Sequence, residues 1–259
     1  MKITIILKLG GALITNKEKP FSLNYSVLYR ICDEISQAYR ECNNRIIIIH
    51  GGGSYGHYVV KEHEEHGNIY STESIAQVVW FMRELNMIIT DMLNSYGLPA
   101  LPVDTHAMFL RVSDRLAVFS KPLIAMINNG LIPILYGDII FNRIGKAEIL
   151  SGDEIAWYFA SLLKPSRLLF ATAVDGIFDR DPADRNARLL PTVKLSELDR
   201  LDTKGVRGID VTGGMRTKLL LGLKYMGEGM DVYIFNGVKT GTIYQAICNN
   251  EIFGTRVVI

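Results

Sequence analysis

The sequence predicts an α/β protein in which helices cover both faces of a mainly parallel sheet. Short apolar runs alternate with longer amphipathic ones along most of the chain, as they do in repeated strand–helix units. Several of the short runs are apolar at every position, which is typical of strands buried on both faces. The chain has 259 residues, which is enough to form a sizeable core in one or two domains.

Short apolar runs predict strands at 3–9, 45–49, 100–103, 132–136, 168–172, 232–235 and 256–259. The segment 138–152 differs from these, because two alternating runs around 143–145 predict a β-hairpin. We find no internal repeat and no linker, so one compact unit of two lobes is expected.

Helices are expected between the strands. Ser22 is a candidate cap for a helix over 23–41. Apolar residues recur in that segment at helical spacing, at Val27, Ile31, Ile35 and Ala38. A second helix is expected over 73–96. Further helices are expected to begin near Lys121, Asp153, Met215 and Thr242.

The bulk composition excludes several classes of function. Lys and Arg number 28 against 27 Asp and Glu, and a net charge of +1 provides no electrostatic footprint for nucleic acid or an anionic membrane. The longest apolar run, near 46–49, is far shorter than the ~20 residues of a membrane span. No signal-peptide pattern precedes the first strand, so a cytoplasmic protein is expected. Cys32, Cys42 and Cys248 fit neither a redox motif nor a metal motif, and free core thiols in a reducing compartment are expected.

Glycine-rich loops follow several of the predicted strands. They read KLGG (8–11), HGGG (50–53), YGD (136–138), SGD (151–153) and NG (236–237). Ligands of open α/β sheets bind beyond the carboxyl ends of the strands. Because glycine has no Cβ, several such loops at one edge would present many backbone N–H donors to an anion.

The stretch HGGGSYGH (50–57) contains a G-x-G-x-x-G match, but two features argue against a dinucleotide site. The loop follows the second predicted strand of the chain rather than the first. In addition, no strand that ends in an acidic residue follows the loop at the spacing of about 20 residues that a dinucleotide site requires. A P-loop is excluded too, because the chain has no G-x-x-x-x-G-K-[ST]. HEEH (63–66) lacks the spacing of a zinc motif and is expected to be a solvated segment, so no protein metal site is predicted.

Three lysines lie close in sequence to the glycine-rich loops: Lys8, Lys17 and Lys218. Phosphoryl transfer needs positive charge on the transferred group and on the bridging oxygens, with little covalent participation by the protein. The combination of lysines and glycine amides therefore favours a phosphoryl-transfer site.

Taken together, the motifs resemble the amino-acid kinase superfamily. LKLGGALIT, HGGG, GD, SGD, TAVDGIF (172–178) and DVTGGM occur in order over nearly the whole chain. Within the superfamily, HGGGSYGH with Lys17 and DVTGGM is most similar to the isopentenyl phosphate kinases of the archaeal-type mevalonate route, which use ATP to make isopentenyl diphosphate. The resemblance implies a three-layer αβα sandwich around an open, mainly parallel sheet, and commonly a homodimer. It implies one domain, 1–259, with an acceptor lobe at about 1–170 and a nucleotide lobe at about 171–259.

The resemblance also implies roles for individual residues. Lys8 and Lys218 would bind ATP phosphates, Lys17 would stabilise the transferred group, and Asp153 would orient the lysines. His57 would join the catalytic group and bind the acceptor phosphate, together with Gly11, Gly52, Gly137 and Gly152. The nucleotide would lie along Gly10, Gly11, Gly53, Asp175, Gly176, Gly213 and Gly214. Mg²⁺ would arrive with ATP. Ala12 and Tyr55 depart from the common Ser and Phe without removing a charge.

The chemistry of the residues agrees with a phosphate acceptor. A phosphate monoester has a second pKa near ~6, so its oxyanion is available at neutral pH without a general base. His57 can donate to such a phosphate. The helix expected over 73–96 is apolar on more than one face, and we expect an apolar acceptor tail against Val78, Met82 and Leu85. The alternatives are a kinase of another small phosphate or phosphonate such as fosfomycin, a uridylate kinase, or a non-catalytic nucleotide-binding module.

Overall fold

The core of the protein is an eight-stranded sheet with the order β10-β12-β11-β9-β1-β2-β6-β3. The computed structural model describes residues 5–16, 18–65, 67, 69–197, 213–227, 229–248 and 251–259. The strands are β1 (Ile5–Leu9), β2 (Ile46–His50), β3 (Ala100–Pro102), β6 (Ile132–Tyr136), β9 (Arg167–Thr172), β10 (Thr192–Lys194), β11 (Val232–Asn236) and β12 (Gly254–Val258). All neighbours are parallel except β11 and β12. The expected mainly parallel sheet is confirmed.

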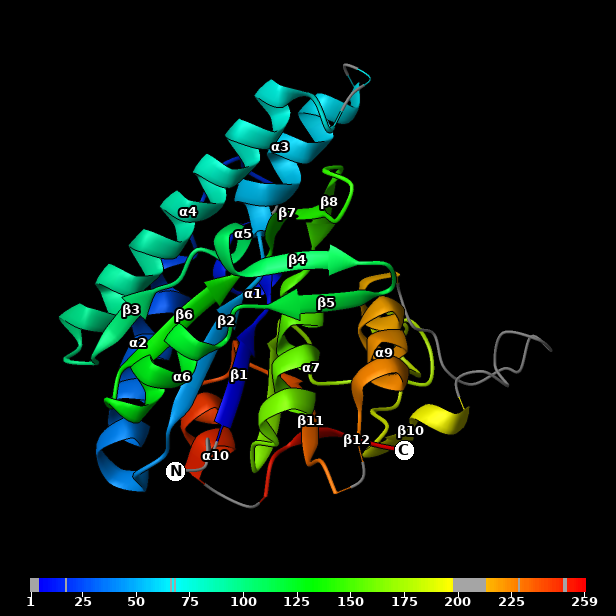
Figure 1. Ribbon diagram of the computed structural model, residues 1–259. Helices are drawn as coiled ribbons and strands as arrows, with labels where there is room; N and C mark the ends of the chain where they lie inside the picture. Colours follow the sequence, from blue (N-terminus) through cyan, green and yellow to red (C-terminus); the bar gives the residue numbers. More distant parts are fainter. Residues whose placement is uncertain are drawn as a thin grey trace.

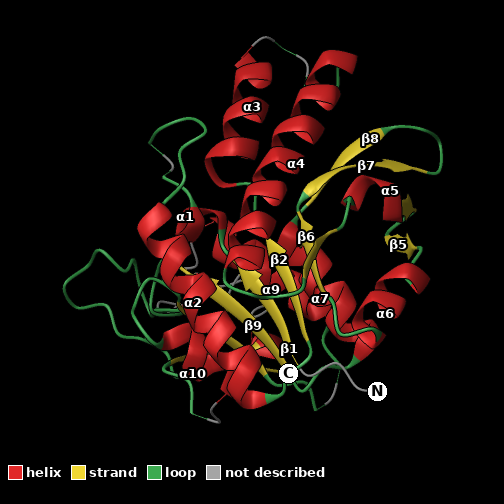
Figure 2. Ribbon diagram, turned by 90° about the vertical axis from the view of Figure 1, so that its left-hand side faces the viewer, coloured by secondary structure: helices red, strands yellow, loops and turns green. Residues whose placement is uncertain are grey.

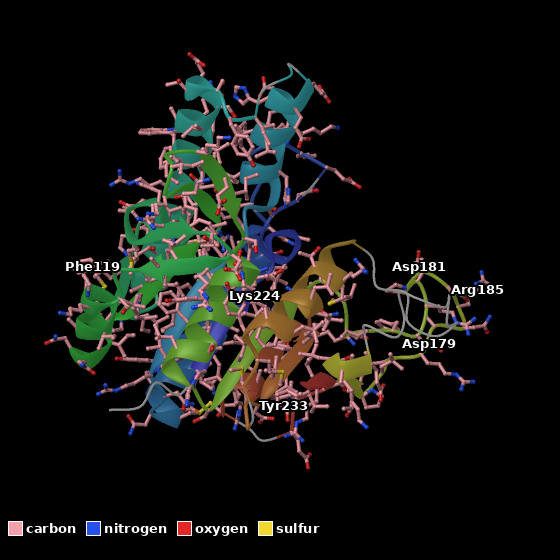
Figure 3. The ribbon with its side chains drawn as sticks, turned by 45° about the vertical axis from the view of Figure 1, so that its right-hand side comes forward. Phe119, Asp179, Asp181, Arg185, Lys224 and Tyr233 are labelled. Atoms are coloured by element: carbon pink, nitrogen blue, oxygen red, sulfur yellow. A yellow bond between two sulfur atoms is a disulfide. The ribbon has the colours of Figure 1, made fainter. Side chains whose placement is uncertain are left out.

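Helices cover both faces of this sheet (Figures 1 and 2). One face packs on α1 (Gly11–Ile14), α2 (Tyr25–Cys42), α4 (Thr72–Ser95) and α10 (Thr242–Cys248). The other face packs on α6 (Lys121–Asn128), α7 (Gly152–Leu163) and α9 (Gly213–Tyr225). Alternation along β1 divides the two cores, since Ile5 and Leu7 belong to the first and Ile6 to the second. None of the described helices is long and apolar enough to span a membrane.

A second, four-stranded sheet with the order β5-β4-β7-β8 lies beside the first. The predicted hairpin is confirmed as β7 (Asp138–Asn142) and β8 (Ala147–Leu150), which pair antiparallel. The sequence analysis missed a second hairpin, β4 (Phe109–Val112) and β5 (Arg115–Val118). Its strands are four residues each and interrupted by charge, so their apolar pattern is weak.

Two helices rise beyond the carboxyl end of the sheet and pack against each other (Figure 1). They are α3 (Gly53–Glu65) and α4, and α5 (Thr105–Met108) lies near their base. The segment after Gly56 is therefore helical; of HEEH, residues 63–65 end α3 and His66 lies outside the described residues. Within the described part of the chain no group of three His, Cys, Asp or Glu side chains is placed to hold a metal ion.

The predicted start of the first long helix needs a correction. The helix begins at Tyr25 with Asn24 in the cap position, not at residue 23 after Ser22. The backbone N–H of Ser22 donates to Ser54 Oγ over 3.1 Å, and Leu23 bridges to Thr15. This tertiary pairing holds the segment extended, which local propensity did not indicate.

The cysteine prediction is wrong for two of the three residues. Cys42, at the end of α2, and Cys248, at the end of α10, form a disulfide with Cα atoms 5.6 Å apart, across 206 residues of sequence. Cys32 is free and buried, and burial raises the pKa of its thiol to about 12. The pairing depends on the packing of α10 against α2, which spacing along the chain cannot reveal.

Candidate active site

A cavity of about 600 Å³ lies where the carboxyl ends of β1, β2, β6 and β9 meet the first turns of α3, α7 and α9. Thirteen of the predicted site residues line it, and these are Lys8, Gly10, Gly11, Gly52, Gly53, His57, Val78, Met82, Gly137, Gly152, Asp153, Gly214 and Lys218. The cavity therefore brings together residues that are as far apart in sequence as Lys8 and Lys218.

Two lysines share one carboxylate in this cavity. Asp153 Oδ1 lies 2.6 Å from Lys8 Nζ and 2.7 Å from Lys218 Nζ. Lys8 comes from β1, Asp153 from the first turn of α7 and Lys218 from α9. Alternation along β1 puts Lys8 on the same face as Ile6, and α7 and α9 cover that face. The three groups are largely buried, so their interactions are weakly screened.

Burial and neighbouring charges change the pKa values of Asp153 and Lys218. Burial alone would raise the pKa of the Asp153 carboxyl, but Lys8 and Lys218 overcome that effect and hold it well below its usual range. Burial, with Lys8 close by, lowers the pKa of Lys218 to about 8, although Asp153 opposes the shift. The trio thus carries a net positive charge at neutral pH in a site suited to a polyanion.

The glycine loops pack backbone against backbone. A Cβ on Gly11 would lie 2.4 Å from the amide nitrogen of Gly53, and Gly53 itself has a φ of +49°. A Cβ on Gly152 would lie 2.8 Å from the carbonyl oxygen of His50. Side chains at these positions would push the loops apart. Their close approach gathers backbone N–H groups around the cavity, as an anion site requires.

A buried histidine braces the second of these loops. His50 ends β2 with no exposed surface, and its Nδ1 lies 3.1 Å from the carbonyl oxygen of Gly51. Asn86 Nδ2 of α4 lies 3.2 Å from the other ring nitrogen and also donates to the carbonyl of Ile134. Burial lowers the pKa of His50 to about 4, so the ring is neutral and donates to Gly51.

Apolar side chains form another wall of the cavity. Val60 of α3, Val78 and Met82 of α4, and Ile149 and Leu150 of β8 line it. His57 lies on α3 one turn before Val60, at the junction of this wall and the glycine loop. The cavity is therefore amphipathic, with charge and backbone amides on some elements and an apolar wall on others.

Met82 also supports the glycine loop. Its sulfur lies 3.1 Å from where a Cβ of Gly52 would be and 2.9 Å from where a Cβ of Gly56 would be. Met82 thus packs directly on the first turn of α3.

Three predicted site residues in the described part of the chain, Leu85, Asp175 and Gly176, do not line the cavity. Leu85 is fully buried and packs in the core with its neighbours on α4. Asp175 turns its carboxylate to Lys239 at 2.6 Å and accepts from Asn236. Gly176 packs against Thr255 with a φ of +153°. Gly213 begins α9. The predictions for Lys17 and for DVT at 210–212 lie outside the described residues.

Sequence reasoning gave no role to several residues that the fold brings to the site. They are His50, Asn86, Asp138, Trp157 and Phe170. Two weak signals were present: His50 ends an otherwise apolar run, and Asn86 is a polar residue in an apolar stripe. Buried polar groups require partners, so a polar residue in an apolar segment indicates a buried hydrogen bond.

Comparison with known proteins identifies the family. The profile of the amino acid kinase family matches residues 4–236. The isopentenyl phosphate kinase of Methanocaldococcus jannaschii is 34% identical over 263 residues, covering 97% of each chain. That of Methanothermobacter thermautotrophicus is 33% identical over 267 residues, covering 98% of each. The chain belongs to the amino acid kinase family, among the isopentenyl phosphate kinases.

Solved structures also place the chain among the isopentenyl phosphate kinases. An X-ray structure of an isopentenyl phosphate kinase matches with a TM-score of 0.82 at 28% identity, covering 98% of this chain and 100% of that one. The family and the three-layer fold predicted from the ordered motifs are both confirmed.

Proposed function

We propose that this protein transfers the γ-phosphoryl group of ATP to isopentenyl phosphate, producing isopentenyl diphosphate and ADP. The observation that carries the proposal is the amphipathic cavity. Lys8, Lys218 and the glycine amides suit phosphate groups, while the wall around Val78 suits a short hydrocarbon tail. Relatives that match nearly the full chain are named isopentenyl phosphate kinases, which supports the proposal.

The lysines supply the catalysis in this proposal. An oxygen of the acceptor phosphate forms a bond to the γ-phosphorus, and the bond to the β–γ bridging oxygen breaks to release ADP. Charge moves onto the bridging oxygen and the equatorial oxygens as this happens. Lys8 and Lys218 bind these oxygens, and Asp153 holds both ammonium groups at 2.6 and 2.7 Å so that little reorganisation is needed.

The acceptor needs a binding group more than a base. As a phosphate monoester it is largely dianionic above its second pKa of ~6 and attacks directly. His57 donates to this phosphate from α3, and the amides of Gly52, Gly53 and Gly152 complete the contact. Two polyanions then meet in one cavity, each with its own donors.

Mg²⁺ is proposed to enter with the nucleotide. Asp153 is engaged by two lysines. Asp138, the other carboxylate among the described residues that line the cavity, accepts from His106 at 2.8 Å and from the N–H of Ile139. The phosphate oxygens of ATP would then hold the ion, and the ion would neutralise part of their charge.

The arrangement of the two substrates and of the subunits follows from the same proposal. The acceptor binds to the part before residue 170 and the nucleotide mainly to the part after it, with Lys8 and Asp153 serving both. The predicted homodimer is consistent with exposed aromatic and apolar side chains on α3 and α4, namely Tyr58, Trp80 and Met87. Light scattering of the purified protein tests the dimer, and the cytoplasmic location stays a prediction.

An acceptor panel tests the function. ADP release is measured with isopentenyl phosphate, fosfomycin and UMP at matched concentrations, with product identity checked by phosphorus NMR. Isopentenyl phosphate is expected to give the largest kcat/KM. A higher kcat/KM with UMP or fosfomycin would transfer the assignment to that acceptor, and no turnover with any of them would contradict a kinase.

Lys17 lies outside the described residues, so its proposed role has a test of its own. Lys17→Ala is expected to lower kcat strongly while ATP affinity changes little, since a charge on the transferred group matters most in the transition state. Unchanged kcat in a folded variant would remove Lys17 from the catalytic group.

A further inference from the structure

Helix α7 contacts Lys218 at both ends of the residue. The carboxylate of Asp153 binds Nζ at 2.7 Å, and the indole Nε1 of Trp157 donates to the backbone carbonyl of Lys218 over 2.9 Å. Asp153 and Trp157 are four residues apart, so they share one face of α7. That face therefore fixes both the main chain and the charged group of Lys218.

The indole hydrogen bond connects two helices within the core. Trp157 has no exposed surface, and the carbonyl it reaches lies in the interior of α9. A buried indole N–H without a partner would be costly, so this bond specifies how α9 is placed along α7. Gly222, one turn further along α9, packs on the same ring, since its Cβ would lie 3.0 Å from Trp157 Cζ2.

An aromatic ring supports the charged end. Lys218 Nζ lies 4.4 Å from the centroid of the Phe170 ring, within the range of a cation–π interaction. Phe170 lies on β9 beside Lys8 of β1, so its ring faces the same side of the sheet as the lysines. Trp157 and Phe170 touch, with ring centroids 5.4 Å apart. The two rings thus form a continuous support beneath Lys218.

We propose that Trp157 and Phe170 are positioning residues for phosphoryl transfer: the Trp157 indole sets where α9 presents Lys218, and the Phe170 ring stabilises its ammonium form. This inference rests on the proposed function, because it assumes that Lys218 binds ATP phosphates. The indole N–H of Trp157 is engaged by the carbonyl of Lys218, and the ring of Phe170 has no polar group, so both residues act through Lys218.

The charged surroundings of Lys218 make the second role measurable. Among the described residues, Lys8 from β1 and Asp153 from α7 are the charged groups that face its ammonium, and β9 contributes only the ring. Without the ring the ammonium loses a stabilising interaction while the other two groups stay in place. Lys218 should then lose its proton at a lower pH.

Trp157→Phe tests the first role, because it keeps an aromatic ring and removes the N–H. We expect kcat to fall about fivefold, the effect of one hydrogen bond, with the KM for isopentenyl phosphate unchanged. The matched control is Trp80→Phe, the same substitution at a residue on α4 that is 67% exposed, and it should leave kcat unchanged. A folded Trp157→Phe protein with wild-type kcat would overturn this role.

Phe170→Leu tests the second role through pH profiles. The alkaline limb of kcat/KM for ATP, and of ATP affinity measured by calorimetry, should move to lower pH by about 0.5 to 1 unit. Phe159→Leu is the control, since Phe159 is equally buried and packs against Phe109 and Tyr158 instead. Both variants should lose thermal stability, and only Phe170→Leu should shift the profile. Equal profiles in the two variants would overturn the role of the ring.

The calorimetric measurement of ATP affinity tests this inference independently of the proposed function. If the wild-type protein phosphorylates no acceptor, the function fails, and the pH dependence of ATP affinity in Phe170→Leu still tests the ring. If the wild-type protein is an active kinase and both variants match their controls, the function stands and the positioning roles fall.

Discussion

Gly11 and Gly53 touch through their backbones, so closely that a Cβ on Gly11 would lie 2.4 Å from the Gly53 amide nitrogen. The contact joins the start of α1, two residues after β1, to the first turn of α3. Both residues line the cavity, so the contact sets the separation of two loops that would hold phosphates.

Gly11→Ala is therefore expected to damage both stability and activity. The methyl group meets backbone rather than a flexible side chain, so the loops must separate, at a cost of about 1–3 kcal/mol. Urea unfolding and steady-state kinetics measure the two effects. Gly227→Ala is the control, because a Cβ there meets nothing within 4 Å. Wild-type kinetics in folded Gly11→Ala would mean that the loop spacing does not matter.

The pH dependence of activity should report Lys218. Burial, with Lys8 nearby, lowers the pKa of Lys218 to about 8, so the free enzyme loses this charge above that pH. We expect kcat/KM for ATP to decline above about pH 8, and kcat to decline at higher pH because bound phosphates favour the ammonium. His50 cannot produce an acid limb above pH 5, since its pKa is lowered to about 4. A flat profile up to pH 10 would contradict the assignment.

The lowered pKa of Lys218 also predicts that stability rises with pH where activity falls. Between about 8 and the ordinary value of 10.5, the unfolded chain binds more protons at Lys218 than the folded protein does. The free energy of unfolding should therefore rise with pH in that window, by about 1 kcal/mol per unit from this group. The measurement is the difference in unfolding free energy between wild type and Lys218→Met from pH 7 to 10. A difference that is constant over this range would show that the pKa of Lys218 is not lowered.

Reduction of the disulfide should lower stability without affecting catalysis. Cys42 ends α2 just before β2 begins, and Cys248 ends α10, so the bond lies at the amino end of β2, away from the cavity. Cys42→Ser should lose about 2–4 kcal/mol of unfolding free energy and keep its kcat at 25 °C. Thiol titration of the denatured, unreduced protein should find one thiol, that of Cys32. Three thiols would mean that the bond is not formed.

Val78→Ala and Met82→Ala should have different effects. Val78 lines the apolar wall, so its truncation should raise kcat/KM for longer prenyl phosphates relative to isopentenyl phosphate, by ~0.8 kcal/mol for each methylene that fits. Met82 also packs on Gly52 and Gly56, so its truncation should raise KM for every phosphate acceptor. Leu85→Ala is the control; it leaves a core cavity costing about 2–5 kcal/mol and should not change selectivity. Identical selectivity in all three variants would contradict the position of the tail.

His57→Ala should separate the two substrates. A charge-assisted hydrogen bond is worth ~1.5–3 kcal/mol, so kcat/KM for isopentenyl phosphate should fall at least about tenfold. ATP affinity, measured by calorimetry without acceptor, should be nearly unchanged. An equal loss for both substrates would place His57 at the shared phosphates rather than at the acceptor.

Much of the fold was predictable because its signals are local. The apolar runs at 132–136 and 168–172 match β6 and β9 to within a residue, since strands buried on both faces need apolar side chains at every position. The hairpin at 138–152 was predicted from alternation. The short β4 and β5 were not, because a strand of four residues with charges in it has no pattern that stands out.

The candidate site also has features that were predictable from the sequence and features that were not. The sequence by itself determined the family, the glycine loops and the lysines, because motif residues keep their order and type along the chain. Only the tertiary structure decided which charges meet: Lys8, Asp153 and Lys218 are far apart in sequence, and parallel strands with crossover helices bring them to one sheet edge. It also turned Val78 to the cavity and Leu85 to the core, and paired Cys42 with Cys248. The orientation of a side chain and the pairing of distant residues depend on packing between segments that are far apart in sequence. Local sequence patterns do not indicate that packing.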